Sequence, residues 1–362
     1  MCCTTEAPKG LCVLDHPNHK TVVAFLALLC LLVACGCRKQ APDHASGSTA
    51  YVIPSQLQDE VDTAMNGLDG AAVVMDVNTG RVLAMVNPKA AMGQAFPVGS
   101  ALKPLTATAA VEQGVANPDL TLPCSGVTSI HGHDYPCWLH GGHGKLNMVE
   151  AIAQSCNIYF YTLGARFHGP ELRDWARRFG FGSATGIQNI DFKESSGQVP
   201  EILFPEKISR FATGDTPDFC ATPLQMAVFA AAIANNGRRL IPRLQTDSSK
   251  KYPLSHPSKQ FNGTVIQADK GLATARRGMA LCVTSSLGTC HALANMGFPA
   301  AGKTGTARHV ANLRTHAWFI GFTPVDEPEV AVVVFLQQGE GARDAAPAAR
   351  RIMQAWHQCK KF

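Results

Sequence analysis

Three short motifs in one order constrain this chain more than any other feature of its sequence. They are Ser-Ala-Leu-Lys at 100–103, Ser-Cys-Asn at 155–157 and Lys-Thr-Gly at 303–305. A Ser-x-x-Lys match arises about once by chance in a chain of this size, and the copy at 248–251 lies in a polar stretch without apolar periodicity. The copy at 100–103 leads instead into an apolar helical pattern, and each of the other two motifs occurs once. We therefore interpret the ordered set, rather than any one motif, as a site.

The first two motifs provide the groups needed for nucleophilic acyl transfer. Ser100 would be the nucleophile, and Lys103, one helical turn later, would take its proton if burial and nearby cations keep the amine neutral. Ser155 would bridge Lys103 and Lys303 and pass the proton to the departing nitrogen. Asn157 would hydrogen-bond a substrate amide and hold Lys103 in place. We predict that these five residues are catalytic.

The third motif has the groups that recognise the end of a peptide. Lys303, with the hydroxyls of Thr304 and Thr306, suits a terminal carboxylate. Gly305 would let a peptide backbone approach the strand closely and pair with its edge. The backbone N–H groups of Ser100 and Thr306 are the expected oxyanion hole, in which each donor contributes about 3 kcal/mol.

Longer sequence runs around the three motifs carry a wider pattern, which covers residues 51–362. The runs lie at 70–76, 78–86, 143–145, 151–160, 179–182, 222–227, 301–307 and 318–324. On these runs the chain resembles the transpeptidase domain of class B penicillin-binding proteins, especially the branch that acts in cell elongation. The resemblance implies an α/β fold of the α+β type, shared with serine β-lactamases: a mostly antiparallel sheet formed from both chain ends and covered by helices. Strand-like runs near both ends, with helical patterns between them, agree with that fold.

The resemblance implies a peptidoglycan D,D-transpeptidase. Ser100 would be acylated by stem peptides that end in D-Ala-D-Ala, which are then cross-linked between glycan strands, and by β-lactams, which mimic them. The enzyme alternative is a D,D-carboxypeptidase or a class D-like β-lactamase, although the latter usually carries an apolar residue at the position of Asn157. A β-lactam sensor and an inactive scaffold are disfavoured, because the sequence offers no signalling half and every catalytic position is chemically competent.

Composition narrows the remaining classes of function. The 362 residues carry a net charge of +5 without a basic run, and 46% of them are hydrophobic, enough to bury one large core. Nucleic-acid binding and intrinsic disorder are therefore excluded. The resemblance also implies a membrane glycosyltransferase as a partner, although a short tether stands where a pedestal domain usually precedes the transpeptidase. No glycosyltransferase region precedes the tether, which argues against a bifunctional class A protein.

The N-terminal region predicts export and membrane attachment. Residues 22–35 form a 14-residue apolar run, shorter than the about 20 residues that cross a bilayer but typical of a signal peptide. Leu-Val-Ala-Cys at 32–35 resembles a lipobox, so Cys35 would be lipidated and become the mature N-terminus; an uncleaved signal anchor is the alternative. We expect a signal peptide or membrane anchor at 1–34, a polar tether at 35–50 and a periplasmic or extracytoplasmic transpeptidase domain at 51–362.

Three cysteines and a histidine near the second motif form a candidate zinc site. Cys124, Cys137, His143 and Cys156 have the spacing C-x12-C-x5-H-x12-C, a Cys₃His donor set suited to tetrahedral zinc but not the spacing of a common finger. Relatives of the elongation branch can hold zinc here through carboxylate, histidine and cysteine ligands, and His143 and Cys156 fall on matching positions. A disulfide between Cys124 and Cys137, with Cys156 a buried thiol, is the alternative. The zinc would be structural, since the chemistry requires no cofactor.

Overall fold

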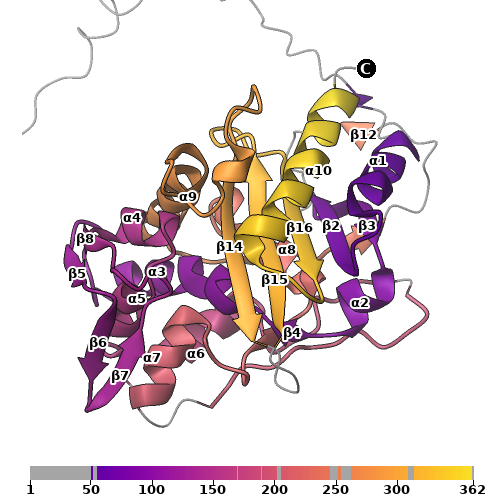
Figure 1. The fold of residues 1–362 in the computed structure, drawn as a ribbon. Helices are drawn as coiled ribbons and strands as arrows, with labels where there is room; N and C mark the ends of the chain where they lie inside the picture. Colours follow the sequence, from indigo (N-terminus) through magenta and orange to yellow (C-terminus); the bar gives the residue numbers. More distant parts are fainter. Residues whose placement is uncertain are drawn as a thin grey trace, which may run out of the picture. The chain divides into compact units, whose positions relative to one another are not determined.

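A six-stranded sheet built from both ends of the described chain organises the fold (Figure 1). Its strands, in order across the sheet, are β11 (Arg243–Leu244), β3 (Arg81–Val86), β2 (Gly70–Asp76), β16 (Val330–Leu336), β15 (Thr315–Thr323) and β14 (Ala301–Arg308). Every neighbouring pair is antiparallel except β11 with β3. Val73 of β2 lies opposite Val333 of β16, so the N-terminal and C-terminal strands pair directly. The expected sheet of mostly antiparallel strands from both chain ends is therefore confirmed.

The central strands read as unbroken apolar runs because both faces of the sheet are covered. Alternate residues point to opposite faces, so Val73 belongs to one hydrophobic core and Val74 to the other. The first core includes α8 (Pro223–Ala234), and the second includes α1 (Ser55–Met65) and α10 (Ala346–Cys359). Figure 1 shows α10 crossing in front of β15 and β16 while α8 lies behind the sheet. Helices on both faces explain the complete burial of β2 and β16.

A group of helices lies beside β14, and two of them begin at motif residues, α3 at Lys103 and α5 at Asn157. The helix α9 (Asp269–Thr284) packs against β14, and α3 (Lys103–Glu112) and α4 (Met148–Ala153) pack against α9. The helix α5 (Asn157–Gly164) in turn packs against α7 (Pro205–Thr213). This arrangement sets the first two motifs beside the strand that carries the third. The other helices are α2 (Pro88–Gly93) and α6 (Glu171–Arg178), with a π-helical turn, η3 (Gly341–Ala345), before α10.

Apolar residues at helical spacing over 149–164 predict one helix, but the structure has two. The chain leaves α4 after Ala153 and enters α5 at Asn157. Apolar residues continue at helical spacing on both sides of the break, and that continuity made the prediction wrong. By contrast, α8 begins and ends as its sequence predicts. Thr222 caps it through a capping box with Gln225, and Gly237, with φ of 90°, follows its end.

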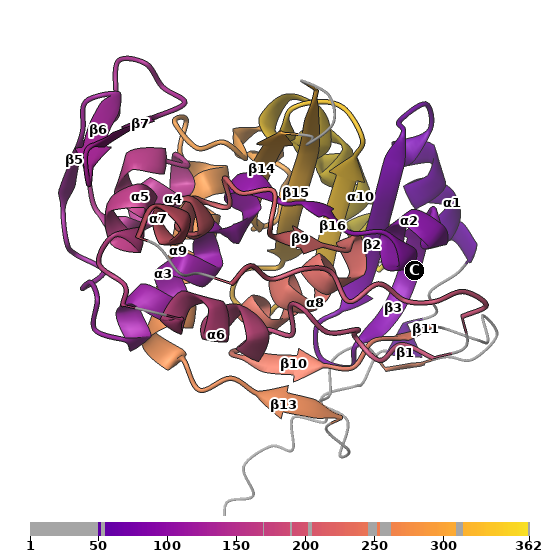
Figure 2. The same ribbon diagram turned by 90° about the horizontal axis from the view of Figure 1, so that it is seen from below.

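Short strands complete the fold and border the helices. Figure 2 shows the hairpin of β6 (Val127–Ile130) and β7 (His133–Pro136) projecting beside α5 and α7. The others are β1 (Ala50–Tyr51), β4 (Phe96–Pro97), β5 (Leu122–Cys124), β8 (Gly144–Leu146), β9 (Cys220–Ala221), β10 (Arg238–Leu240), β12 (Tyr252–Pro253) and β13 (Gly263–Val265).

The computed structural model describes residues 50–51, 55–168, 170–188, 190–201, 205–244, 252–253, 262–308 and 314–360. The chain divides into two units, Met1–Gly47 and Ser48–Phe362, and the described residues belong to the second. The predicted signal peptide or anchor, Cys35 and all but the last residue of the tether lie outside the described residues. Within the described part of the chain, we find no helix with the length and apolar character needed to cross a bilayer.

Candidate active site

The predicted nucleophile and the predicted base of the first motif face each other across one helical turn. Ser100 lies in a 3₁₀ turn, η1 (Gly99–Leu102), and Lys103 is the first residue of α3. Lys103 is fully buried, and its Nζ lies 2.9 Å from Ser100 Oγ. Of the other oxygens around Nζ, the two nearest are Asn157 Oδ1 at 2.6 Å and the backbone oxygen of Ser155 at 2.8 Å. A neutral amine that donates its two hydrogens to these acceptors keeps its lone pair for the Ser100 proton.

Burial and charge both favour the neutral form of Lys103. Removal from water lowers the pKa of Lys103 well below its usual range, and the positive charge of Lys303 lowers it further. Cys156, Cys137 and Asp215 raise this pKa, but more weakly than burial and Lys303 lower it. The site therefore stabilises the protonation state that a general base requires.

Ser155 lies in the sharp break between α4 and α5. Its φ is 56°, in the left-handed region that L residues rarely adopt. Its Oγ lies 3.2 Å from Lys103 Nζ and accepts a 2.8 Å hydrogen bond from Lys303 Nζ. The break thus sets the hydroxyl between the two lysines, while the carbonyl of the same residue reaches Lys103. Such a conformation costs about 1–3 kcal/mol and is typical of functional sites.

Lys303 lies behind the wall of the cleft rather than on its surface. Its side chain is fully buried and also donates to the backbone oxygen of Thr304 at 2.8 Å, and burial lowers its pKa. Thr304 and Thr306 line the cleft, and Thr304 Oγ1 lies 2.7 Å from Thr289 Oγ1. The two threonines therefore form part of the wall of the cleft, and the buried Lys303 side chain lies next to Thr304.

Gly305 allows close packing within the protein itself, whether or not a peptide pairs with its strand as the motif predicts. A Cβ at this position would lie 2.4 Å from the backbone oxygen of Val98, so the protein's own chain, not a peptide, fills this space. Gly99 makes a similar approach, because a Cβ there would lie 2.5 Å from the backbone oxygen of Thr306. The two glycines allow the segment that carries Ser100 to pack directly against β14. This packing brings the backbones of Ser100 and Thr306, the expected oxyanion hole, close together.

Ser100, Ser155 and Asn157 line one cleft of about 1030 Å³, and Lys103 and Lys303 are buried beside it. Several other residues line this cleft but belong to no recognised motif, so the sequence alone does not indicate them. Tyr161 is an exception, since it lies one helical turn after Asn157 and on the same face. The cleft residues that the motifs do not indicate include Tyr135, Trp138, Tyr161, Arg210, Asp215 and Thr289.

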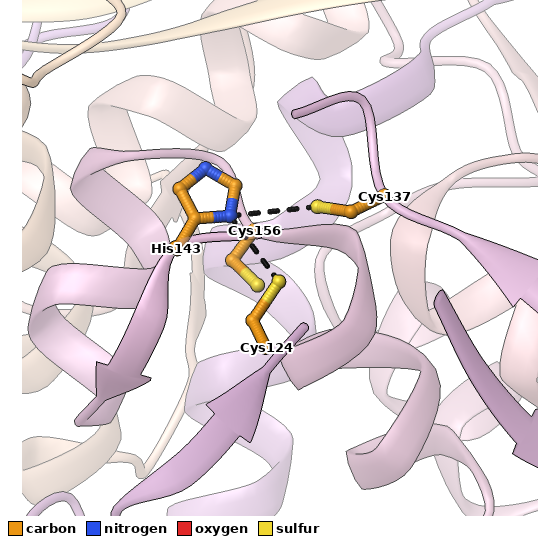
Figure 3. A group of neighbouring side chains, drawn as sticks. All are labelled: Cys124, Cys137, His143 and Cys156. Carbon is orange, nitrogen blue, oxygen red and sulfur yellow. Dashed lines mark hydrogen bonds between the residues drawn. The ribbon is translucent and has the colours of Figure 1, made fainter. Parts of the chain in front are cut away.

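The predicted zinc ligands come together directly behind the relay serine. The donor atoms of Cys124, Cys137, His143 and Cys156 all lie within 4.8 Å of one another (Figure 3). Cys124 ends β5, Cys137 follows β7, and Cys156 is the residue after Ser155. Every described cysteine is a free thiol, so the alternative disulfide between Cys124 and Cys137 is not found in this structure.

The spacing of these donors fits a tetrahedral ion. His143 Nδ1 lies 3.4 Å from Cys124 Sγ and 3.5 Å from Cys137 Sγ. Zinc bonds of about 2.0–2.1 Å to nitrogen and 2.3 Å to sulfur separate such ligands by about 3.5 Å in a tetrahedron. Hydrogen bonds from Cys156 and His143 lower the pKa of Cys137, and the thiolate is the form of cysteine that binds zinc. The residues present therefore fit a structural zinc ion.

The sheet is mostly antiparallel and covered by helices, and its edge strand β14 borders a cleft lined by serine and backed by lysine. These features together are typical of serine acyl-transfer domains. This chain belongs to the family of penicillin binding protein transpeptidase domains, which its residues 70–354 match. The peptidoglycan D,D-transpeptidase MrdA of Acinetobacter baumannii is 28% identical to it over an aligned region that covers 87% of this chain and 54% of that relative. The chain therefore spans about half the length of the curated relatives that it matches first.

Solved structures show the same fold. The crystal structure of Pseudomonas aeruginosa PBP2 in complex with WCK 5153 superimposes with a TM-score of 0.74 and 26% identity, over 84% of this chain and 75% of that one. A chain in a structure of a peptidoglycan synthase complex, which describes the coordination of polymerization and crosslinking, has a TM-score of 0.70 and 27% identity. That match covers 85% of this chain and 60% of the other.

Proposed function

We propose that this protein is a peptidoglycan D,D-transpeptidase of the elongation branch. The observation that carries the proposal is the position of Lys103 Nζ, which lies between Ser100 Oγ and the oxygens of Ser155 and Asn157. Membership of the family, and similarity to relatives named D,D-transpeptidases, support a donor peptide that ends in D-Ala-D-Ala. β-Lactams would acylate the same serine because they mimic that donor.

In the first half-reaction, Ser100 Oγ attacks the carbonyl carbon of the donor while Lys103 takes the serine proton. The C–N bond to the last D-alanine then breaks. The proton passes from Lys103 through the Ser155 hydroxyl to the departing nitrogen, a path that the 3.2 Å contact between Lys103 Nζ and Ser155 Oγ supports. Lys303 keeps the hydroxyl oriented and places a positive charge behind the donor carboxylate.

In the second half-reaction, an amine of another stem peptide attacks the ester on Ser100. The new C–N bond forms as the C–O bond to Ser100 breaks, and a proton returns to Ser100 Oγ through Lys103. Water in place of the amine would make the protein a D,D-carboxypeptidase, and fast hydrolysis of a β-lactam adduct would make it a β-lactamase. A cleft of about 1030 Å³ is at the upper end of the range for ligand sites, which favours two peptide substrates over one.

Intact-protein mass spectrometry with benzylpenicillin tests the proposal. The full chain should gain one stable adduct, Ser100→Ala should gain none, and Ser248→Ala should behave as the unaltered protein. Ser248 is the matched control because it also stands three residues before a lysine. An adduct that forms and then disappears quickly would favour the β-lactamase, and the absence of any adduct on folded protein would refute the acyl-enzyme.

We also propose that Cys124, Cys137, His143 and Cys156 bind a structural zinc ion. The ion would fix the strands β5 and β7 to the start of α5, and no step of the reaction needs it. Inductively coupled plasma mass spectrometry should find about one zinc per chain, and Cys137→Ser should lose it together with part of the thermal stability. Cys220→Ser is the matched control, since Cys220 lies outside the cluster. Full zinc occupancy in Cys137→Ser would refute this ligand set.

The attachment of the protein to the cell envelope is a further part of the proposal. Cys35 would be lipidated, or residues 1–34 would remain as a signal anchor, so that the domain faces the periplasm or the cell exterior. Similarity to a chain of a peptidoglycan synthase complex supports a membrane glycosyltransferase as partner. Metabolic labelling with an alkyne fatty acid should mark the full chain but not Cys35→Ser, and equal labelling of both would refute lipidation at this residue.

A further inference from the structure

A second group of side chains lines the cleft and comes from β7, α5 and the end of α7. Arg210 Nη1 and Asp215 Oδ2 lie 3.0 Å apart, and Tyr161 Oη donates to the same carboxylate oxygen at 3.0 Å. The guanidinium of Arg210 lies 5.7 Å from the ring centre of Tyr135, whose ring lies 4.7 Å from that of Tyr161. All four residues line the same cleft as Ser100. The acyl-transfer steps described above give none of them a task.

These charged groups are accessible to a ligand, and hydrogen bonds hold the chain between them. The side chains of Arg210 and Asp215 are 53% and 49% exposed, whereas Tyr135 and Tyr161 are almost fully buried beneath them. The backbone N–H of Asp215 donates to the carbonyl of Arg210 at 3.0 Å, and Thr213 Oγ1 donates to the same carbonyl at 2.8 Å. Among the described residues, Asp215 Oδ1 has no hydrogen-bond partner. The pair can therefore bind a ligand without first rearranging.

The backbone brings this ion pair next to the nucleophile. Gly214 has φ of 77°, and a Cβ there would lie 2.0 Å from the backbone oxygen of Gly99. Gly214 therefore packs against Gly99, the residue before Ser100, and Asp215 is the residue after Gly214. Tyr161 lies one turn after Asn157 on α5, so the helix that supplies the amide to Lys103 also supplies the phenol to Asp215.

An exposed arginine beside an exposed aspartate is complementary to a group that carries both charges. The guanidinium fork binds a carboxylate, and the aspartate accepts hydrogen bonds from an ammonium or amine. The donor carboxylate already has a proposed site in the cleft, at Thr304 and Thr306. The remaining substrate of a transpeptidase is the acceptor, which must present an amine to the ester on Ser100.

We propose that Arg210 and Asp215, positioned by Tyr161 and Tyr135, form the acceptor subsite and select an amine that has a neighbouring carboxylate. Arg210 binds the carboxylate and Asp215 holds the amine. The bound ammonium first releases one proton to solvent. The neutral amine then forms the C–N bond as the ester C–O bond to Ser100 breaks, and its second proton passes to Ser100 Oγ. This subsite rests on the transpeptidase function proposed above.

The partition of one acyl-enzyme between amine and water tests the subsite. The full chain is loaded with a thioester analogue of the donor in the presence of D-alanine or D-alaninamide, which has the same amine but no carboxylate. Mass spectrometry then gives the ratio of transfer product to hydrolysis product. Both products arise from one acyl-enzyme, so any change in acylation rate cancels in the ratio.

The expected result differs for the two charged residues. Asp215→Asn should lower the transfer ratio for both acceptors by about tenfold, which is the value of one charge-assisted hydrogen bond. Arg210→Gln should lower the ratio for D-alanine alone, to the level of D-alaninamide. Tyr161→Phe, a milder change, should lower both ratios less than Asp215→Asn. Asp174→Asn is the matched control, because it breaks the Arg173–Asp174 ion pair, whose residues do not line the cleft.

Two negative outcomes have different meanings. Unchanged ratios in Asp215→Asn and Arg210→Gln, with the unaltered protein transferring to D-alanine, would overturn the subsite and leave the transpeptidase intact. An unaltered protein that is acylated but only hydrolyses the donor would overturn both proposals.

Discussion

Replacement of Lys303 by methionine tests whether this residue tunes the base as well as orienting the relay. Ser155 Oγ contacts both Lys103 Nζ and Lys303 Nζ, at 3.2 and 2.8 Å. The two nitrogens are therefore no more than about 6 Å apart, and at an effective dielectric constant of about 20 their repulsion is about 3 kcal/mol. Removal of the charge at 303 would therefore lower the ratio of neutral to protonated Lys103 at a fixed pH by about a hundredfold.

The pH dependence of acylation by a fluorescent penicillin measures this effect. Acylation needs neutral Lys103, so its rate rises as pH increases through the pKa of Lys103. Because Lys303 lowers that pKa, the acid limb of the profile should move to higher pH in Lys303→Met. The matched control is Lys270→Met, since Lys270 is exposed at the start of α9. A rate that falls equally at every pH, with the limb unmoved, would show that Lys303 only orients Ser155 and that burial alone lowers the pKa.

Three further substitutions test the framework around the cleft. Gly305→Ala should lower the free energy of unfolding by about 1–3 kcal/mol in denaturant titrations, because its Cβ would lie 2.4 Å from the backbone oxygen of Val98; unchanged stability would contradict the close packing of η1 on β14. Thr289→Val removes the hydroxyl that accepts a hydrogen bond from Thr304. If that bond orients Thr304 toward the ligand carboxylate, penicillin acylation at low concentration should slow by about fivefold, the value of a hydrogen bond of about 1 kcal/mol; an unchanged rate would show that the bond does not orient Thr304 for binding. Thr222→Ala removes the cap of α8 and should cost about 1 kcal/mol of stability without changing the pH profile of acylation.

The sheet could be predicted from sequence because its central strands are buried on both faces. Runs such as 71–75 and 330–336 are apolar throughout, and their type depends little on distant contacts. The break at Ser155 could not be predicted, because residues 149–164 have helical spacing on both sides of it. Contacts with Lys103 and Lys303, both far away in sequence, accompany its left-handed backbone.

The motif residues were predictable in identity but only partly in position. Order and spacing led to Ser100, Lys103 and Lys303, yet they gave no sign that Lys303 is buried next to Thr304 rather than exposed in the cleft. The packing of Gly305 could not be predicted for a related reason, since the backbone against its Cα comes from Val98, 207 residues earlier in the chain. Arg210 and Asp215 belong to no motif, and only folding places them in the same cleft as Ser100.

The pairing of β2 with β16 has a consequence for the timing of folding. β2 is synthesised early, but its neighbour in the sheet, which sets Val73 opposite Val333, is among the last elements to be made. Pairings of such long sequence separation form slowly, and the strand that carries Lys303 is also made late. When Ser100 and Lys103 have left the ribosome, β14 has not yet been made. The growing chain then lacks Lys303, whose charge lowers the pKa of Lys103, and also the strand that borders the cleft. We therefore expect Ser100, the proposed nucleophile, to become reactive only after synthesis, when β14 has joined the sheet.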